Sequence, residues 1–451
     1  MEKAYAHIDQ NLDRFIEELS VLVRQPSISA RWEGVEECSR LLIQMMQNVG
    51  ISSRILRMGG KRNPPLVHGE ILNPEAKRTL LIYGHYDVQP PEPLDAWESP
   101  PFEPVIRNGR MYGRGTADNK GQFFAHFKAI ESVLKAGEKL PVNIKFLLDP
   151  EEEIGSPSLN EFCRKNKALF AADVALNSDG PMDTSGRPRL SFGNRGVLYV
   201  EVIARGANTD LHSGNFGGPI PNPAWRLVEF LSTLREADGT VAIEGFYDDI
   251  VPPTPKEKAM MARIPFDEKE FMDKYGLKKF APPDDLSYAE KLMFRPTLNI
   301  AGLTSGYGGA GSKTVLPCRA VLKMDMRLVV NQTPEDIFQK YVRHMKRNGF
   351  DDLEVNLLNS YAPSRTSVDH PLAPQFVEAI RQGFQKDPVL IPASGGSFPG
   401  AAIQTILNIP ILSVPYGNAD ENNHAPNENL AIDCFRGGIR TTAALLYRLA
   451  G

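Results

Sequence analysis

Four short segments of the sequence combine histidine or carboxylate residues with the end of an apolar run or with a glycine-rich turn. They are Gly84–Asp87, Gly113–Gly121, Asp149–Ser156 and Asn177–Gly180. If the apolar runs are strands of a parallel sheet, their carboxyl ends line one rim, where open α/β sheets bind ligands. Carboxylates gathered at one rim repel one another unless a cation lies between them. Mixed histidine and carboxylate ligands suit zinc, manganese or cobalt better than magnesium or calcium.

Each segment taken alone has an ordinary structural explanation. His85-x-Asp87 is a weak pattern, the run Glu151–Glu153 is typical of a solvated face, and Asp179 could cap a helix or start a turn. The informative feature is that all four segments fall at the same end of consecutive α/β units. This conjunction indicates a metal site.

The elements that must position these segments alternate between strands and helices. Apolar runs at residues 79–83, 142–148 and 173–176 predict buried strands, and residues 121–136 predict the helix between the first two. Amphipathic helices are predicted before Pro26 and over residues 35–49. This alternation predicts a mostly parallel sheet with helices on both faces.

The pattern changes after about residue 190. The predicted order becomes β-α-β-β-α-β, with elements at residues 197–204, 223–235, 296–301, 319–330, 334–347 and 353–358. This order is that of a ferredoxin-like α+β unit. From about residue 371 the sequence again predicts alternating helices and strands. We therefore predict one catalytic α/β domain, formed by residues 1–191 and 371–451, interrupted by an inserted domain at residues 192–370.

Composition excludes several classes of function. The 451 residues include 51 Lys and Arg against 55 Asp and Glu, so no basic field for nucleic acid is expected. No apolar run approaches the roughly 20 residues of a membrane span. The four cysteines are far apart and form no Cys-x-x-Cys motif. A disulfide framework is therefore not expected, and a cytoplasmic location is predicted.

The motifs also carry a family resemblance. GHYDVQP, GRGTADNKG, EEEIGS, NSDG and the late NNHAPNE (Asn422–Glu428) resemble the signature set of a co-catalytic zinc peptidase family. That family includes carnosinase-type dipeptidases, carboxypeptidase G, aminoacylase, acetylornithine deacetylase and succinyl-diaminopimelate desuccinylase. The motifs occur in the family's order over nearly the whole chain, and the inserted unit resembles the family's lid domain.

The resemblance implies two divalent metal ions per subunit, zinc first, with manganese or cobalt as alternatives. By this resemblance, His85 and Asp179 bind one metal, Glu153 and His424 bind the other, and Asp118 bridges both. A bridging carboxylate of this kind suits a two-metal hydrolase.

The resemblance also implies the groups that act on the substrate. Glu152 matches the general base, and Asp87 matches a carboxylate that fixes the His85 ring. His212 matches a lid histidine that stabilises the oxyanion in the active site of the opposite subunit, so a homodimer through the lid domain is expected.

Further residues match the part of the family site that binds the substrate. Arg327 matches an arginine that clamps the terminal carboxylate, and His370 resembles a second substrate-binding residue. The loop formed by Ser394, Gly395, Gly396 and Ser397 could offer backbone N–H groups to the same carboxylate. The expected activity is hydrolysis of the amide bond of dipeptides or short peptides with a free terminal carboxylate.

Two features favour the dipeptidase branch of the family. Asp179 is an aspartate where deacylases carry glutamate, and Ser312–Pro317 (SKTVLP) looks carnosinase-like. An N-acyl-amino-acid deacylase or desuccinylase is the alternative. A non-catalytic binding protein on this fold is a further possibility, but it would be expected to lack a ligand or the base, and none is missing.

Overall fold

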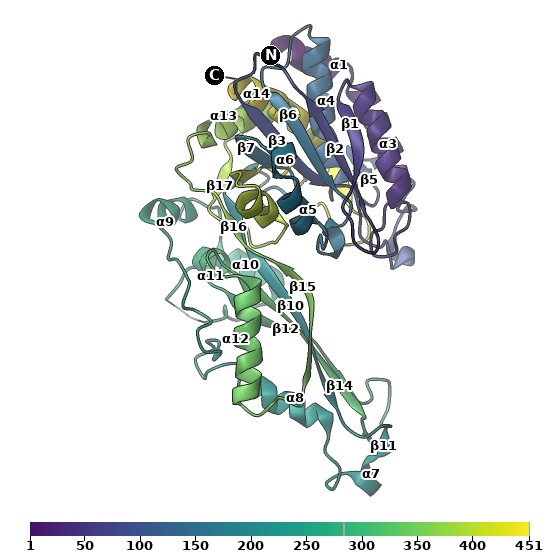
Figure 1. Cartoon of the computed structure of the whole chain (residues 1–451), viewed down its shortest axis with the longest axis vertical. Helices are drawn as coiled ribbons and strands as arrows, with labels where there is room; N and C mark the ends of the chain where they lie inside the picture. Colours follow the sequence, from purple (N-terminus) through teal and green to yellow (C-terminus); the bar gives the residue numbers. More distant parts are fainter. Residues whose placement is uncertain (283–284, 451) are drawn as a thin grey trace.

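Two sheets organise the chain in the computed structural model, which describes residues 1–282 and 285–450 (Figure 1). An eight-stranded sheet, here called the central sheet, lies at one end of the molecule. A four-stranded antiparallel sheet, here called the lid sheet, extends away from it. The chain passes from the central sheet to the lid sheet and back, as predicted for an α/β fold interrupted by an α+β unit.

The central sheet is mixed and mostly parallel, which confirms the predicted fold class. In spatial order its strands are β1 (Ser52–Arg57), β2 (Pro65–Ile71), β6 (Asn143–Asp149), β3 (Thr79–His85), β7 (Val174–Asn177), β18 (Ile411–Ser413), β8 (Arg189–Ser191) and β17 (Val389–Ile391). Neighbours in the run β6-β3-β7-β18 are parallel. Their carboxyl ends therefore meet at one rim, as the sequence requires for a shared site.

Helices cover both faces of the central sheet. Leu80 and Ile82 point to one face, covered by α1 (Glu2–Gln10), α2 (Leu12–Arg24), α3 (Val35–Asn48), α4 (Lys120–Lys135), α13 (Ala373–Phe384) and α14 (Ile432–Arg448). Leu81 and Tyr83 point to the other face, covered by α5 (Leu159–Lys165), α6 (Lys167–Phe170) and the π-helical turn η3 (Ala402–Ile406). The alternation follows from the two-residue period of a strand, and the four consecutive residues Leu80–Tyr83 of β3 supply both layers.

The lid sheet has the predicted ferredoxin-like order. Its strands are β12 (Thr297–Ser305), β14 (Arg319–Leu328), β10 (Gly196–Arg205) and β15 (Glu354–Tyr361), and all neighbours are antiparallel. The helices α8 (Pro223–Ser232) and α12 (Pro334–Arg347) cover one face, where Leu322, Met324 and Met326 are buried. The Thr333 side chain caps α12 by accepting the Asp336 N–H.

The stretch between α8 and β12 joins the two sheets. It contains α9 (Pro255–Met261), α10 (Glu268–Tyr275) and α11 (Tyr288–Phe294). Met261, Met293 and Phe294 pack against Val389 and Ile391 of the central sheet. Nothing in the Pro- and charge-rich composition of this stretch predicted the contact, because it depends on where the chain returns in three dimensions.

Shorter elements complete the fold. They are β4 (Val105–Arg107), β5 (Arg110–Tyr112) and β19 (Asn429–Ala431) in one small sheet, β9 (Gly193–Asn194) paired with β16 (Ser364–Arg365), β11 (Leu211–His212) paired with β13 (Val315–Leu316), the 3-10 turns η1 (Leu94–Ala96) and η2 (Glu152–Ile154), and α7 (Ser213–Phe216). Among the helices within residues 1–282 and 285–450, none is long and apolar enough to span a membrane.

Candidate metal centre

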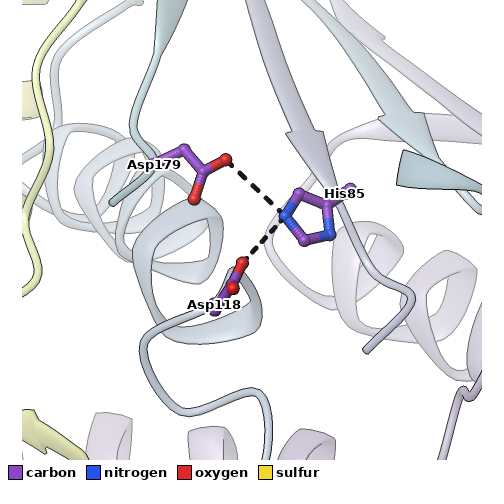
Figure 2. Close-up of side chains that lie close together, drawn as sticks. All are labelled: His85, Asp118 and Asp179. Atoms are coloured by element: carbon purple, nitrogen blue, oxygen red, sulfur yellow. Dashed lines mark ion pairs between the residues drawn. The ribbon is translucent and has the colours of Figure 1, made fainter. Parts of the chain in front are cut away.

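The first cluster of ligand-type residues forms where two parallel strands end and a helix begins. His85 is the last residue of β3, Asp118 lies in the loop before α4, and Asp179 follows β7. Figure 2 shows one ring nitrogen of His85 facing both carboxylates. Its Nε2 lies 3.1 Å from Asp118 Oδ1 and 3.6 Å from Asp179 Oδ2. The predicted parallel sheet thus brings these three side chains together.

A second cluster shares Asp118 with the first. His424 Nε2 lies 3.0 Å from Asp118 Oδ2 and 3.3 Å from Glu153 Oε2. Each oxygen of Asp118 therefore faces a different cluster. All five side chains that the sequence predicts as metal ligands lie in one of the two clusters.

The donor atoms fit divalent cations. The buried His85 Nε2 has no hydrogen-bond partner among the described residues, although two carboxylates flank it. A buried polar atom without a partner calls for an explanation, and an ion is one. The ligand atoms of each cluster lie within 4.8 Å of one another. Imidazole nitrogens with carboxylate oxygens form a set that zinc, manganese and cobalt accept.

The electrostatics of the rim favour positive charge. Burial, with a contribution from Asp118, raises the pKa of Glu153 to about 7. Burial also raises the pKa of Glu152 well above its usual range, with the carboxylates of Glu153 and Asp179 adding to the effect against His85. Hydrogen bonds to Asp118 and Glu153 raise the pKa of His424 to about 11. Crowded carboxylates of this kind are stabilised by a bound cation.

Asp87 contacts the His85 ring, as predicted, and also the turn that carries the glutamates. The His85 Nδ1 lies 3.1 Å from the backbone oxygen of Asp87 and 3.5 Å from its Oδ1. The carboxylate itself accepts the backbone N–H groups of Glu152 and Glu153, at 3.1 and 3.0 Å. Asp87 is fully buried. Its contacts hold both the histidine ring and the turn η2, which carries the two glutamates.

The loop that carries Asp118 is held by a residue far along the chain. Glu428 accepts N–H groups from Gly115, Ala117 and Asp118 at 3.0, 2.9 and 2.9 Å, and its carboxylate pairs with Arg114 at 2.8 Å. The peptide bond after Asp118 is cis. Glu428 belongs to the NNHAPNE motif, but the sequence did not assign it a role because its partners are more than 300 residues away.

Two amides complete the support of the clusters, and neither was predicted. Asn119 donates to the Ser178 carbonyl at 2.6 Å and to Asp179 Oδ1 at 3.2 Å, and its own Oδ1 accepts the His85 N–H at 3.3 Å. Gln89 donates to Glu153 Oε2 at 2.8 Å. Asn119 thereby ties the ends of β3 and β7 to the loop before α4.

The three consecutive glutamates have different surroundings. Glu153 belongs to the second cluster, and Glu152 is partly exposed at the same rim. The interpretation of the run as a solvated face is wrong for Glu151, because this residue is 2% exposed and its carboxylate accepts the Ser158 N–H at 3.3 Å. Gly155, with φ of +94°, ends η2, and the chain turns back so that the Ser156 N–H donates to the Glu151 carbonyl at 2.7 Å.

His424 closes one side of the second cluster and faces solvent on the other. Its side chain is 56% exposed, and its φ of +59° is uncommon for a residue other than glycine. Backbone conformations of this type concentrate at functional sites. The second cluster is therefore accessible from outside.

Arg327 and the loop Ser394–Ser397 come together beside the centre. Arg327 Nη1 donates to Ser397 Oγ at 2.9 Å. Arg327 lies opposite Val197 on β10, and Val197 lies opposite Tyr361 on β15. Two strand spacings separate Arg327 from Tyr361, so their backbones lie roughly 10 Å apart. The Tyr361 hydroxyl donates to the carbonyl of Glu152 at 2.9 Å.

His370 does not join this group. It precedes α13 and lines a separate cavity of about 910 Å³ with Lys256 and Arg381, and none of the clustered residues lines that cavity. Its Nδ1 accepts the Leu372 N–H at 3.3 Å. A substrate-binding role for His370 stays a prediction.

His212 lies at the tip of the lid, far from the clusters of its own chain (Figure 1). It follows β10, whose ten residues span roughly 30 Å from the end nearest the central sheet. Its Nδ1 accepts the Gly214 N–H at 3.1 Å, and its exposed ring lies 3.3 Å from Thr314 Oγ1. Within one subunit, His212 cannot act on a group held at Asp118.

Comparison with known proteins identifies a family and relatives that this chain is similar to. The sequence model of a protein family, described as Peptidase family M20/M25/M40, matches residues 81–448. The Cys-Gly metallodipeptidase dug1 of Schizosaccharomyces pombe is 30% identical over 475 residues, covering 100% of this chain and 98% of the relative. The Beta-Ala-His dipeptidase of Mus musculus is 30% identical over 473 residues, covering 100% and 96%.

Solved structures agree with this result. The M20 family metallo-carboxypeptidase Sso-CP2 from Sulfolobus solfataricus superposes with a TM-score of 0.90 at 36% identity, covering 97% of this chain and 99% of the other. The di-peptidase Dug1p from Saccharomyces cerevisiae superposes with a TM-score of 0.88 at 27% identity, covering 100% and 98%.

Proposed function

The chain belongs to the peptidase family M20/M25/M40, and from this premise we propose that it is a metallodipeptidase with two divalent ions per subunit. The observation that carries the proposal is the pair of ligand clusters joined by Asp118. The similar metallodipeptidases, which align over the full chain, support dipeptides as the substrates.

The proposed ligand roles follow the two clusters. His85 and Asp179 hold one ion, Glu153 and His424 hold the other, and Asp118 contacts both. When bound, two such ions polarise the scissile carbonyl and make a water molecule acidic enough to attack near neutral pH. Zinc is the proposed metal, with manganese or cobalt as alternatives, because all three accept this donor set.

Glu152 is the proposed general base. Its carboxylate takes a proton from the attacking water and returns it to the amine that leaves when the amide C–N bond breaks. Its neighbour Glu153 is tied to His424 and Gln89, whereas the carboxylate of Glu152 has no hydrogen-bond or ion-pair partner among the described residues. A pKa raised by burial brings Glu152 closer to the range in which a carboxylate accepts a proton at neutral pH.

The substrate's terminal carboxylate is proposed to bind between Arg327 and the loop Ser394–Ser397. Arg327 already contacts Ser397, and a guanidinium group binds a carboxylate through two parallel hydrogen bonds. The register of the lid sheet puts Arg327 near Tyr361, which touches Glu152. A substrate held at Arg327 is thus within reach of the base.

A homodimer is proposed to complete the site with His212 of the partner subunit. The lid, here proposed to comprise residues 192–370, exposes apolar side chains on α8 and on the edge strand β12. Trp225 is 66%, Val228 44%, Ile300 50% and Leu303 49% exposed. Exposed apolar groups on an unpaired edge strand are features of a protein interface. We also propose a cytoplasmic location, for which the free cysteines Cys38, Cys163, Cys318 and Cys434 provide support.

A substrate panel with a base variant tests the proposed function. We expect the metal-loaded protein to hydrolyse unblocked dipeptides faster than N-acetyl or N-succinyl amino acids. We expect Glu152→Gln to lower kcat by about 10²–10⁴-fold, because the base is removed while the five ligands remain. Metal content is measured on both proteins by elemental analysis, and unchanged content in the variant is the control.

Three results would contradict the proposal in different ways. Faster cleavage of N-acyl substrates would indicate a deacylase of the same family. An inert wild type with full metal content would indicate a binding protein. Full activity of Glu152→Gln would remove this residue from the reaction.

A further inference from the structure

A cavity of about 570 Å³ lies beside Arg327, and the proposed reaction does not use it. It lies between the edge strand β12, α11 and the stretch that follows α8. The charged groups among its described lining residues are five cations and two carboxylates: Arg195, Arg235, Lys291, Arg295 and Arg327 against Asp238 and Asp325. The cavity therefore carries an excess of positive charge.

Arg195 differs from the other cations in its burial and in its lack of an ion-pair partner among the described residues. Its side chain is only 8% exposed, and its Nε donates to the carbonyl of Gly395 at 3.1 Å. The rest of the guanidinium group has no hydrogen-bond acceptor and no ion-pair partner among the described residues, and it lines the cavity. Burial and the nearby charge of Arg327 lower the pKa of Arg195 to about 10. A buried charge without a partner is costly, so an anionic ligand would stabilise it.

Neither carboxylate of the cavity forms an ion pair with Arg195. Asp325 Oδ2 lies 3.4 Å from Arg327 Nε, and its Oδ1 accepts a hydrogen bond from Asn299 at 2.8 Å. Asp238 accepts the N–H and hydroxyl of Thr240 at 2.9 and 2.7 Å. Both carboxylates are engaged within the lid, Asp325 in part with Arg327, which leaves the guanidinium group of Arg195 without either of them.

The position of the cavity identifies which part of a substrate would enter it. Arg327 lines the cavity and also contacts Ser397 of the loop proposed to bind the terminal carboxylate. Gly395 of the same loop contacts Arg195. A side chain that enters the cavity therefore belongs to the same residue as the terminal carboxylate, the C-terminal residue of the substrate.

We infer that this cavity binds an acidic side chain of the substrate's C-terminal residue, so that dipeptides ending in glutamate or aspartate are preferred. Arg195 and Arg295, which stacks on Tyr247 at 4.8 Å, take the side-chain carboxylate, while Arg327 keeps the terminal one. Hydrogen bonds between charged partners are short and strong. The volume admits any side chain, so charge rather than size provides the selection. The inference rests on the proposed dipeptidase function.

Matched peptide pairs test the inference. We expect the metal-loaded wild type to show kcat/KM at least about tenfold higher for Ala-Glu than for Ala-Gln, and a smaller preference of the same sign for Ala-Asp over Ala-Asn. Arg195→Gln should bring the Ala-Glu to Ala-Gln ratio close to one, chiefly through KM for Ala-Glu. Arg319→Gln removes a charge from the far end of β14, outside the cavity, and should leave the ratio unchanged.

Two further measurements guard against an uninformative result. Arg295→Gln, on a less buried residue, replaces Arg195→Gln if that variant shows no cooperative thermal transition, and it should lower the ratio in the same direction. Calorimetry with free L-glutamate and L-glutamine needs no turnover, and we expect the metal-loaded wild type to bind L-glutamate more tightly.

The outcomes separate the two proposals. Cleavage of dipeptides with equal kcat/KM for Ala-Glu and Ala-Gln, and equal binding of the two amino acids, overturns the inference and leaves the dipeptidase function standing. Preferential binding of L-glutamate without cleavage of any dipeptide overturns the function and supports an acidic-side-chain site. A ratio that survives both Arg195→Gln and Arg295→Gln shows that the cavity does not produce the preference, which also overturns the inference.

Discussion

At the residue scale, Asp118 is the group on which both ligand clusters depend. One of its oxygens faces His85 and the other faces His424, and the backbone N–H of the same residue is held by Glu428. Its position is thus fixed from the backbone, and its carboxylate is left for ligation. Residues held in this way keep a binding geometry without rearrangement.

Metal content should respond to this sharing. We expect Asp118→Ala to lose most of both ions, because each cluster loses an oxygen, whereas Asp179→Ala should retain the ion of the second cluster. Elemental analysis after dialysis measures the ratio of metal to protein. Chelation of the wild type should lower Tm, since ions that bind only the folded state stabilise it.

Glu151→Gln provides the matched control for these variants. Glu151 belongs to the same run of glutamates but contacts Ser158 and lies in neither cluster, so the variant should keep its full metal content. A wild-type metal ratio in Asp118→Ala would disprove the shared-ligand arrangement.

At the element scale, the turn η2 is the point where the lid sheet meets the metal centre. The turn carries Glu152 and Glu153, Asp87 holds its N–H groups, and the Tyr361 hydroxyl of β15 contacts its carbonyl. A Cβ on Gly155, which ends the turn, would lie 2.3 Å from Oδ1 of Asn359 on the same strand. The φ of the turn therefore favours glycine, and a Cβ would also displace the Asn359 side chain.

Gly155→Ala should consequently lower kcat/KM by at least about tenfold, because displacement of the turn moves the base and one ligand. Gly137 is the matched control: its φ is +80°, but a Cβ there would meet nothing within 4 Å. Gly137→Ala should lower Tm through backbone strain alone and leave kcat/KM unchanged. Equal kinetics in both variants would contradict a steric role for Asn359.

At the scale of the whole molecule, two residues with proposed roles in the reaction lie at opposite ends of the lid sheet. Arg327 lies at the end near the central sheet, and His212 lies beyond the other end of the same sheet. The first can serve its own subunit, whereas the second can serve only another. The proposed dimer follows from this separation, because a complete site then needs residues from two chains.

Mixing two inactive variants tests the dimer. His212→Ala and Glu152→Gln should each be nearly inactive with metal intact. After co-refolding or subunit exchange, a mixed dimer has one site with its own Glu152 and the partner's His212. We expect recovery of up to roughly a quarter of wild-type activity, since about half of the dimers are mixed and each has one complete site. A monomeric mass by sedimentation, or no recovery despite subunit exchange, would contradict the arrangement.

Many elements of the fold and the residues of both clusters could be predicted from the sequence alone, because the patterns that indicate them are local. The period of apolar residues distinguished the strands of the central sheet from those of the lid sheet, and ligand-type residues directly after strands marked the rim. The residues of both clusters could be named because they lie in short motifs. Their chemistry depends on residue type, which the sequence displays directly.

Other features were decided only by tertiary structure. Glu428 meets the loop of Asp118, Asn359 lies against Gly155, and α9 and α11 pack near β17. Arg195 lies beside Arg327 and has no counter-ion among residues 1–282 and 285–450. Each is a contact between segments far apart in the chain, fixed by strand register and by where the insertion returns. A local pattern contains the types of two such residues but not the distance between them, and that distance determines whether they bond, clash or repel.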